Sequence, residues 1–264
     1  MEGGGRKEEE GSGESVVLYG KGPGGLAWVT LNRPQVLNAI NLEMRDALWE
    51  AMHAAQADPE VRVVIFKGAG DRAFSAGADI SEFGTAPSYV EARRARRERD
   101  LWWYMMRMDK VLIAAIHGYA LGAGIELPMC CDIRIASDDA RMGLPEVGLG
   151  YIPSAGGTQT LPRHVPQGVA MQMILTGDPI DAQTALRYGL VQRVVPRERL
   201  YAEAEEIAKR ILRCPPEAVR LAKRAILEGV EMPLQDGLRF EASLAQRALL
   251  TSEAKERLAA VVGR

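Results

Sequence analysis

The chain has 264 residues, of which 47% are hydrophobic and 26% charged, with a formal net charge of −2 at pH 7. It is long enough to bury a sizeable core, as one large domain or as a domain with an appendage. So small a net charge gives no field over the whole surface that would attract nucleic acid or anionic lipid. Two of the three cysteines, Cys130 and Cys131, are neighbours and none forms a C-x-x-C pair, which indicates a reducing compartment, and we expect the cytoplasm.

Residues 1–14 are dominated by glycine and charged residues and have almost nothing apolar to bury. We expect them to form a disordered tail that contains neither a signal peptide nor a lipidation motif. The most apolar segment, 111–125, is interrupted by His117 and is shorter than the roughly 20 residues that a membrane-spanning helix needs. The sequence therefore predicts no membrane partner.

Hydrophobic periodicity predicts strands that alternate with helices in the first part of the chain. We expect a β-hairpin over 15–32, an irregular loop over 33–41, a helix over 42–58, buried strands over 61–70 and 110–120, helices over 86–109 and 121–131, and strands over 132–137 and 140–144. Beyond residue 160 the periodic segments are helical, at 168–177, 181–189, 201–213, 216–229 and 233–263. This order predicts an α/β core over 15–200 and a helical C-terminal region over 201–264.

Ser75 lies in the sequence AFSAG, which resembles the turn that carries the nucleophile of serine hydrolases. That turn requires G-x-S-x-G, and here its first position is Ala73. The histidines that such a serine would need, His53, His117 and His164, lie in no diagnostic context, and His117 within AAIHGYA is typical of a packed or hydrogen-bonded core residue. A serine hydrolase is therefore disfavoured.

The glycine-rich runs 22–27 and 122–127 do not predict a dinucleotide site. The first lies inside the expected hairpin, and the second lacks the third glycine and the later acidic residue of the Rossmann fingerprint. The sequence contains no G-x-x-x-x-G-K-[ST] motif and no cluster with metal-ligand spacing, so we expect no catalytic metal.

Two segments share one construction: a buried strand, a run of small residues and then a polar or acidic residue. They are VRVVIFKGAGDRAFSAGADI and KVLIAAIHGYALGAGIELP. Small side chains let a ligand approach the backbone, and a helix that begins there leaves its first N–H groups without partners. Two such groups that converge would form an oxyanion hole. Taken singly, each segment is equally consistent with tight packing of a turn against the core.

Glu126 follows the second run of small residues in an otherwise apolar setting, where a carboxylate is costly unless it has a partner or a task. Glu146 lies 20 residues later, on a loop after the next strand, and the chain between them turns back at 137–139. The two carboxylates could therefore meet, and paired carboxylates in a cleft move protons at a carbon centre or a water. Spacing alone does not distinguish this from a chance pair of glutamates.

Four motifs in order, NRPQVLNAIN, AFSAGADI, HGYALGAGIELPMCCDIRIAS and GLPEVGLGYIPSAGGTQTLPRHV, resemble the enoyl-CoA hydratase/isomerase family, also called the crotonase family. The resemblance runs from residue 16 to the C-terminus. It implies a spiral core of ββα units and a helical C-terminal region that builds trimers, commonly as a dimer of trimers. It also implies an acyl-CoA thioester as substrate and no separate cofactor, because coenzyme A is part of the substrate.

The resemblance implies a role for each matching residue. The backbone N–H groups of Ala78 and Ala123 would form the oxyanion hole, and Glu126 and Glu146 would be catalytic, Glu126 in activating water and Glu146 in exchanging a proton with the α-carbon. The substrate-binding residues would be Ala76, Gly77, Asp79, Ile80, Gly122, Gly124 and Ser154. The implied reaction is the reversible hydration of 2-enoyl-CoA to 3-hydroxyacyl-CoA, and Ser75 would be a packing residue.

The chain departs from the family pattern at Pro128, Ser154, Ser81 and Val261. Since proline has no N–H to donate, Pro128 fits a helix only if that helix begins late enough that the donor is unpaired anyway. These departures leave open the affinity for coenzyme A and the range of substrates. The alternative to hydration within the family is another crotonase reaction on the same enolate, such as double-bond isomerisation, decarboxylation or C–C cleavage.

Residues 91–100 contain five arginines and are the part least like the family. They are typical of a solvated helix face, with a role facing the phosphates of coenzyme A as the next interpretation. Use of the scaffold to bind RNA or a protein partner is a third, but nucleic acid is disfavoured because Trp102, Trp103 and Tyr104 form one block instead of alternating with the basic residues.

Overall fold

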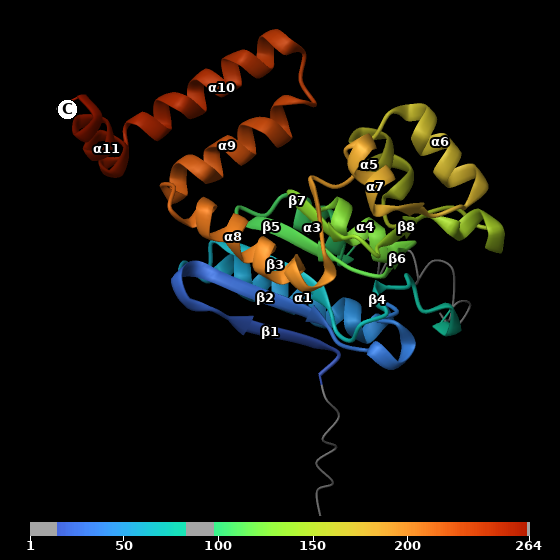
Figure 1. The fold of residues 1–264 in the computed structure, drawn as a ribbon. Coiled ribbons are helices and arrows are strands. Elements are labelled where there is room, and N and C mark those ends of the chain that lie inside the picture. Colours follow the sequence, from blue (N-terminus) through green and yellow to red (C-terminus); the bar gives the residue numbers. More distant parts are fainter. Residues whose placement is uncertain (1–14, 83–97, 263–264) are drawn as a thin grey trace, which may run out of the picture.

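The computed structural model describes residues 15–82 and 98–262, and its strands form two sheets (Figure 1). The larger sheet has the order β1 (Val17–Lys21), β2 (Leu26–Leu31), β3 (Val63–Gly68), β5 (Val111–Ile116), β7 (Ile133–Ser137) and β10 (Arg193–Val195). The smaller sheet has the order β4 (Ala73–Ser75), β6 (Tyr119–Leu121), β8 (Arg141–Gly143) and β9 (Ile180–Asp181). The expected hairpin is confirmed, since β1 and β2 pair antiparallel in the register Val17 to Leu31.

The α-helices are α1 (Leu42–Ala57), α3 (Leu101–Met106), α4 (Ala123–Met129), α5 (Gly157–His164), α6 (Gln167–Thr176), α7 (Ala182–Tyr188), α8 (Leu200–Leu212), α9 (Pro216–Gly229), α10 (Leu234–Leu249) and α11 (Ser252–Val262). Short 3-10 turns lie at Pro23–Gly25, Pro34–Val36, Ile80–Glu82, Pro145–Leu149 and Arg197–Arg199. The expected helix over 42–58 is confirmed by α1, whose N-cap residue Asn41 accepts a hydrogen bond from the backbone of Met44.

Pairs of consecutive strands connect the two sheets. β3, β5 and β7 run parallel in the larger sheet, and β4, β6 and β8, which follow them in the chain, run parallel in the smaller one. This repeated step between two sheets is the spiral of ββα units that the resemblance implies. Because each strand pair ends at the same side of the smaller sheet, the loops that follow β4, β6 and β8 are brought together.

Both faces of the larger sheet are buried, as is usual for parallel strands. On β3, Val64 and Phe66 pack in one core cluster with residues of α1, and Val63 and Ile65 pack in another with residues of α8. Helix α8 falls almost entirely in the 201–264 range expected for the C-terminal region, yet it packs on the sheet. Helix α9 contacts the body through Lys223, which pairs with Asp132 at 2.8 Å, and α10 and α11 stand away from the body (Figure 1).

The prediction of one strand over 110–120 is wrong, because the chain turns at His117 and Gly118 and passes from β5 in the larger sheet to β6 in the smaller one. Gly118 has φ of +52°, and a β-carbon there would lie 2.1 Å from the carbonyl oxygen of Arg72. The short elements β4, β9, β10 and α5 were also missing from the prediction, since two to eight residues are too few to show a period.

Some expectations fall outside the described residues, namely the disordered tail over 1–14 and most of the arginine-rich segment over 91–100. Of the helix expected over 86–109, the described part contains α3. Within residues 15–82 and 98–262, no helix has both the length and the apolar character that crossing a membrane requires.

Candidate active site

The loop after β2 holds the first run of small residues in place. Asn38 is fully buried and has a positive φ of 55°; its side chain accepts a hydrogen bond from the backbone N–H of Arg33 and donates to the carbonyl oxygens of Ala69 and Ala73. Its own carbonyl oxygen accepts a hydrogen bond of 2.8 Å from the hydroxyl of Ser75. The Ser75 hydroxyl in turn accepts from the N–H of Gly77 at 3.2 Å, so Ser75 is a buried packing residue.

The bend at Gly77 and Ala78 turns one N–H group away from this loop. Ile40 donates its N–H to the carbonyl of Gly77 at 2.8 Å and accepts from the N–H of Asp79 at 3.0 Å. Because N–H groups alternate in direction along an extended chain, the N–H of Ala78, between these two contacts, points to the opposite side. No backbone hydrogen bond among the described residues uses it.

The second bend lies at Gly122, the N-cap residue of α4. Gly122 has φ of +52°, and the first N–H of the helix, that of Ala123, has no acceptor among the described backbone groups. A β-carbon at Gly77 would lie 2.7 Å from the carbonyl oxygen of Leu121 and 3.5 Å from the backbone nitrogen of Ala123. The two bends therefore meet, and they do so only because residue 77 has no side chain.

Helix α4 packs directly on β4. A β-carbon at Gly124 would lie 2.2 Å from the carbonyl oxygen of Ser75, so only glycine permits this approach. The structure thus brings Gly77, Gly122 and Gly124 close together beside the backbone nitrogen of Ala123, while Ala76 donates its N–H to the carbonyl oxygen of Leu37.

Glu146 reaches the bend at Gly122 from the 3-10 turn after β8. Its side chain is 4% exposed, and its Oε1 lies 2.9 Å from where a β-carbon of Gly122 would stand. Its other carboxylate oxygen, Oε2, is buried and has no hydrogen-bond partner among the described residues. Burial raises the pKa of this carboxyl above its ordinary value, because desolvation penalises the charged form.

Glu126 projects from the first turn of α4 and is 2% exposed. Its Oε1 accepts hydrogen bonds from the backbone N–H groups of Ala155 at 3.0 Å and Gly157 at 2.6 Å. A β-carbon at Gly157 would lie 2.8 Å from that oxygen, so the glycine at this position makes room for the carboxylate. Two amide donors fix the orientation of the Glu126 carboxyl group.

Tyr151 lies near both acids and was not singled out in the sequence. Burial raises the pKa of its hydroxyl, and the negative charges of Glu146 and Glu126 raise it further. Both carboxylates therefore lie within electrostatic range of one hydroxyl group. Asn38 was missed as well, because its role depends on contacts with residues more than 30 positions away.

Three further residues predicted to bind substrate, Asp79, Ile80 and Ser154, are partly or fully exposed. The carboxylate of Asp79 forms an ion pair of 2.9 Å with Arg33 and accepts a hydrogen bond of 2.7 Å from the hydroxyl of Ser81. These contacts hold the pKa of Asp79 below its ordinary value, and the hydrogen bond from Ser81 has the larger effect. Ile80 is 63% exposed, and Ser154 is exposed directly before Ala155.

The condition expected for Pro128 is not met, because α4 begins at Ala123 and Pro128 lies inside it. The helix instead ends one residue later. Its last turn is closed by hydrogen bonds that span three residues, from the N–H of Cys130 to the carbonyl oxygen of Leu127 and from the N–H of Cys131 to that of Pro128. The missing donor is tolerated since the helix is only seven residues long.

The remaining candidates have structural roles or lie elsewhere. His117 is fully buried with Nδ1 3.5 Å from the hydroxyl of Tyr201, as expected of a core histidine. Val261 is 71% exposed on α11. Among residues 15–82 and 98–262, no three His, Cys, Asp or Glu side chains are grouped to hold a metal ion.

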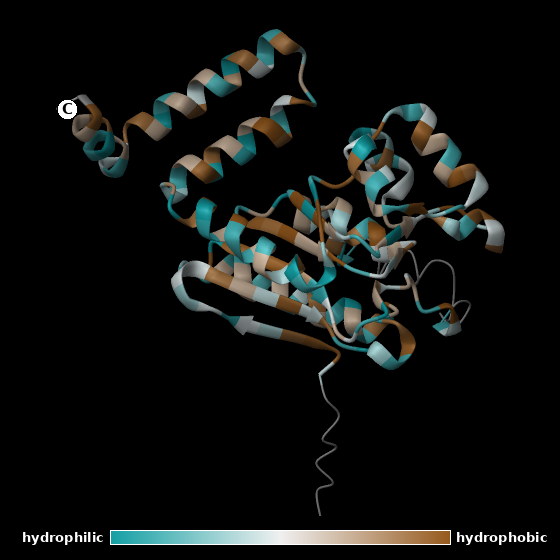
Figure 2. Cartoon of the chain, viewed as in Figure 1, coloured by the Kyte–Doolittle hydropathy of each residue, from teal (hydrophilic) through white to brown (hydrophobic). Residues whose placement is uncertain are grey.

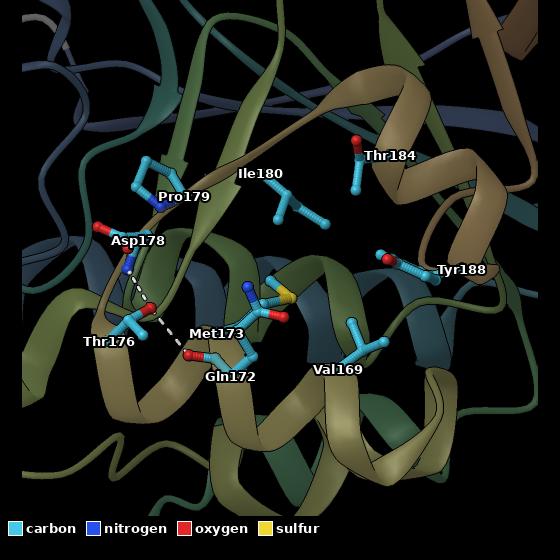
Figure 3. A pocket seen from close by; sticks show the side chains of 9 residues that line it. All are labelled: Val169, Gln172, Met173, Thr176, Asp178, Pro179, Ile180, Thr184 and Tyr188. Atoms are coloured by element: carbon cyan, nitrogen blue, oxygen red, sulfur yellow. Dashed lines mark hydrogen bonds between the residues drawn. The ribbon is translucent and has the colours of Figure 1, made fainter.

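A separate cavity of about 190 Å³ lies between α6, β9 and α7 (Figure 3). Its lining includes Gln172, Met173, Pro179 and Tyr188, and none of the predicted site residues. It is therefore not part of the crevice that holds the two glutamates.

Known proteins resemble this chain in sequence and in fold. Residues 21–262 match the model of the family described as enoyl-CoA hydratase/isomerase. A crotonyl-CoA hydratase of Syntrophomonas wolfei is 42% identical over 89% of this chain and 90% of its own, and a short-chain-enoyl-CoA hydratase of Clostridium acetobutylicum is 41% identical over 94% of each. The crystal structure of an enoyl-CoA hydratase from Bacillus anthracis, 38% identical, superimposes with a TM-score of 0.88 over 94% of this chain and 96% of that one.

Proposed function

Because the chain belongs to the enoyl-CoA hydratase/isomerase family, we propose that it catalyses the reversible addition of water to 2-enoyl-CoA thioesters, giving 3-hydroxyacyl-CoA. The observation that carries this proposal is the meeting of the bends at Gly77 and Gly122 beside the buried carboxylate of Glu146, with a second buried carboxylate, Glu126, in the first turn of the helix that Gly122 caps. Relatives named for hydration of crotonyl-CoA and short-chain enoyl-CoA support a short acyl group as the first substrate to test.

The N–H groups of Ala78 and Ala123 would bind the thioester oxygen. As water adds to the double bond, negative charge collects on this oxygen in an enolate, and donors that are already oriented stabilise that charge. Their lack of partners among the described backbone groups supports this assignment. Loss of one such donor costs roughly 3 to 4 kcal/mol in comparable sites.

The two glutamates would divide the proton transfers. Glu126, oriented by Ala155 and Gly157, accepts a proton from water as the water oxygen bonds to the β-carbon. Glu146, whose raised pKa favours the protonated form, gives its proton to the α-carbon. Transfer of the proton from Glu126 to Glu146 restores both groups for the next turnover. Because the two titrations are coupled, an activity profile would report the pair and not either acid alone.

The remaining predicted residues would bind the substrate around these groups. Ala76, Gly77, Gly122 and Gly124 would admit the thioester to the backbone, and Asp79, Ile80 and Ser154 would contact the substrate from partly or fully exposed positions. The scheme requires no metal and no separate cofactor, since coenzyme A enters as part of the substrate.

The C-terminal helices would build a homotrimer, or a dimer of trimers. Support comes from apolar side chains that α9 and α10 leave exposed: Ile226, Val230, Leu234, Leu238 and Leu249 (Figures 1 and 2). The cytoplasm remains the proposed location, in keeping with free thiols at Cys130, Cys131 and Cys214.

The test is the loss of enoyl absorbance when crotonyl-CoA is mixed with the protein and with its Glu126→Gln and Glu146→Gln variants. Each substitution should lower kcat by about 10²- to 10⁴-fold, the range for loss of a general acid or base. Glu50→Gln, on the exposed side of α1, is the matched control and should leave kcat unchanged. A wild-type rate in either site variant would defeat the assignment, and a panel of other acyl-CoA thioesters read by mass spectrometry would then identify the reaction.

A further inference from the structure

Two side chains meet the C-terminal end of α4, the helix that carries Glu126. Arg134 donates from Nη1 to the carbonyl oxygens of Cys131 at 2.6 Å and Pro128 at 3.4 Å, and from Nε to that of Leu190 at 2.7 Å. His164, the last residue of α5, lies with Nε2 3.0 Å from the carbonyl oxygen of Met129. The carbonyl groups with which α4 ends are therefore bound by side chains from outside the helix.

Arg134 is an unusual cation, because it is 3% exposed and forms no ion pair with a carboxylate among the described residues. A buried charge is costly unless its donors are satisfied. Here backbone carbonyls satisfy them, and the free carbonyls at a helix C-terminus carry the partial negative charge that favours a cation.

The contacts of His164 determine which nitrogen of its imidazole ring carries the proton. A carbonyl oxygen only accepts hydrogen bonds, so Nε2 carries the proton, and Nδ1 is left to accept from Nη2 of Arg134 at 3.5 Å. Burial first, and then the charge of Arg134, lower the pKa of His164 to about 4, so the imidazole is neutral at neutral pH and keeps both bonds.

Helix α4 needs support at this end for a reason visible in the sequence. Pro128 has no N–H for the carbonyl oxygen of Gly124, and the helix has only seven residues. Its other end presents the N–H of Ala123, and Glu126 lies in its first turn. A tilt or shift of so short a helix would move both groups together.

We propose that Arg134 and His164 are positioning residues for the reaction centre, which hold the C-terminal carbonyls of α4 so that Ala123 and Glu126 keep their alignment. The inference rests on the proposed function, since it assigns these two residues to the same site. A misplacement of about 1 Å can lower turnover about 10²-fold, so a loosened helix end should be seen in kcat.

The experiment compares His164→Gln, which can still donate to Met129 and accept from Arg134, with His164→Leu, which can do neither. His164→Leu should lower kcat on crotonyl-CoA by about tenfold or more while KM changes little, and His164→Gln should restore most of the loss. Val17→Ala, in the edge strand β1, is a control for loss of stability alone and should leave kcat unchanged at temperatures well below unfolding. If His164→Leu does not fold, His164→Asn, which is polar but too short to reach both partners, takes its place with the same expectation.

A second readout separates this inference from the proposed function. The absorption of a cinnamoyl-CoA analogue moves to longer wavelength when its thioester carbonyl is polarised. The shift is read on mixing, before hydration removes the chromophore, so it reports on the oxyanion hole separately from turnover. The wild-type protein should shift this absorption and His164→Leu should shift it less. An equal shift together with an equal kcat would overturn the positioning role and leave the hydratase proposal intact, whereas a wild-type protein that neither shifts the analogue nor hydrates crotonyl-CoA would overturn both.

Discussion

Gly122 lies directly against Glu146: a β-carbon at residue 122 would stand 2.9 Å from Oε1 and 3.5 Å from the carboxyl carbon. The same residue caps α4, adopts φ of +52° and precedes the N–H of Ala123. One glycine therefore sets the distance between the proposed oxyanion donor and the proposed proton donor.

Gly122→Ala should separate these two groups. The added methyl group must displace Glu146 or tilt α4, so we expect kcat on crotonyl-CoA to fall about 10²-fold. The strained backbone should lower the free energy of unfolding by about 1 to 3 kcal/mol. Gly148→Ala, in the same 3-10 turn as Glu146 but with open space around its Cα, is the control. Equal kcat values for the two variants would show that the contact has no catalytic role.

Glu146 should make the folded protein less stable as pH rises. Since burial raises the pKa of Glu146 in the folded state, that state holds its proton more tightly than the unfolded chain does. Stability is then lost from the ordinary Glu pKa of 4.5 upward until the raised value is passed. Glu146→Gln removes this dependence, so its Tm should match that of the wild type at lower pH and exceed it at neutral pH. A difference in Tm that is constant between pH 4.5 and 7.5 would contradict the raised pKa.

Glu126→Gln should have the opposite effect on stability. The Glu126 carboxylate accepts two backbone hydrogen bonds, which are stronger when the acceptor is charged. We expect the substitution to lower the free energy of unfolding by about 1 to 2 kcal/mol at neutral pH, as measured by urea denaturation. A stabilising effect of Glu126→Gln, like that expected of Glu146→Gln, would show that the two backbone hydrogen bonds to Glu126 do not stabilise the folded state.

Ser75→Ala distinguishes packing from nucleophilic catalysis. Without the hydroxyl, the carbonyl of Asn38 and the N–H of Gly77 lose a buried partner, which should cost about 1 to 3 kcal/mol of stability. Turnover should fall less than about 10²-fold, because only the bend beside Ala78 loosens. Removal of a nucleophile would abolish turnover instead. Ser243→Ala, at an exposed position of α10, controls for the substitution itself.

Much of this site could be predicted from the sequence because its parts are local. A run of small residues after a buried strand permits close approach to the backbone, by a ligand or by another turn, and at Gly77 and Gly124 the structure shows close packing against neighbouring backbone. A glutamate in an apolar helix is conspicuous for the same reason, since burial of Glu126 requires partners. Composition and periodicity also sufficed for α1, where buried residues recur at helical spacing.

The parts that could not be predicted depend on contacts between distant segments. His117 and Gly118 interrupt the apolar run over 110–120, but two residues in the sequence do not distinguish a local irregularity of one strand from a passage between two sheets. The clash that a side chain at Gly118 would cause with Arg72 marks the turn only in the structure. In the sequence, Asn38 does not differ from an ordinary loop residue. Only the structure shows that its side-chain amide donates hydrogen bonds to the carbonyl oxygens of Ala69 and Ala73. The support of α4 by His164 likewise joins residues 35 positions apart.

The exposed apolar face of α10 gives a prediction about assembly. Leu234, Leu238 and Leu249 are spaced by four and eleven residues, which places them on one side of the helix, and all three are more than half exposed. A charge in the middle of this side would have to be desolvated if another copy covered it, so Leu238→Asp should shift the protein toward monomers in light scattering coupled to size-exclusion chromatography. Ser243→Asp adds the same charge on the opposite side of α10 and should not. Because burial of Leu238 by a partner requires both copies, the effect should diminish as protein concentration is raised. A wild-type protein that elutes as a monomer at all concentrations would rule out the trimer.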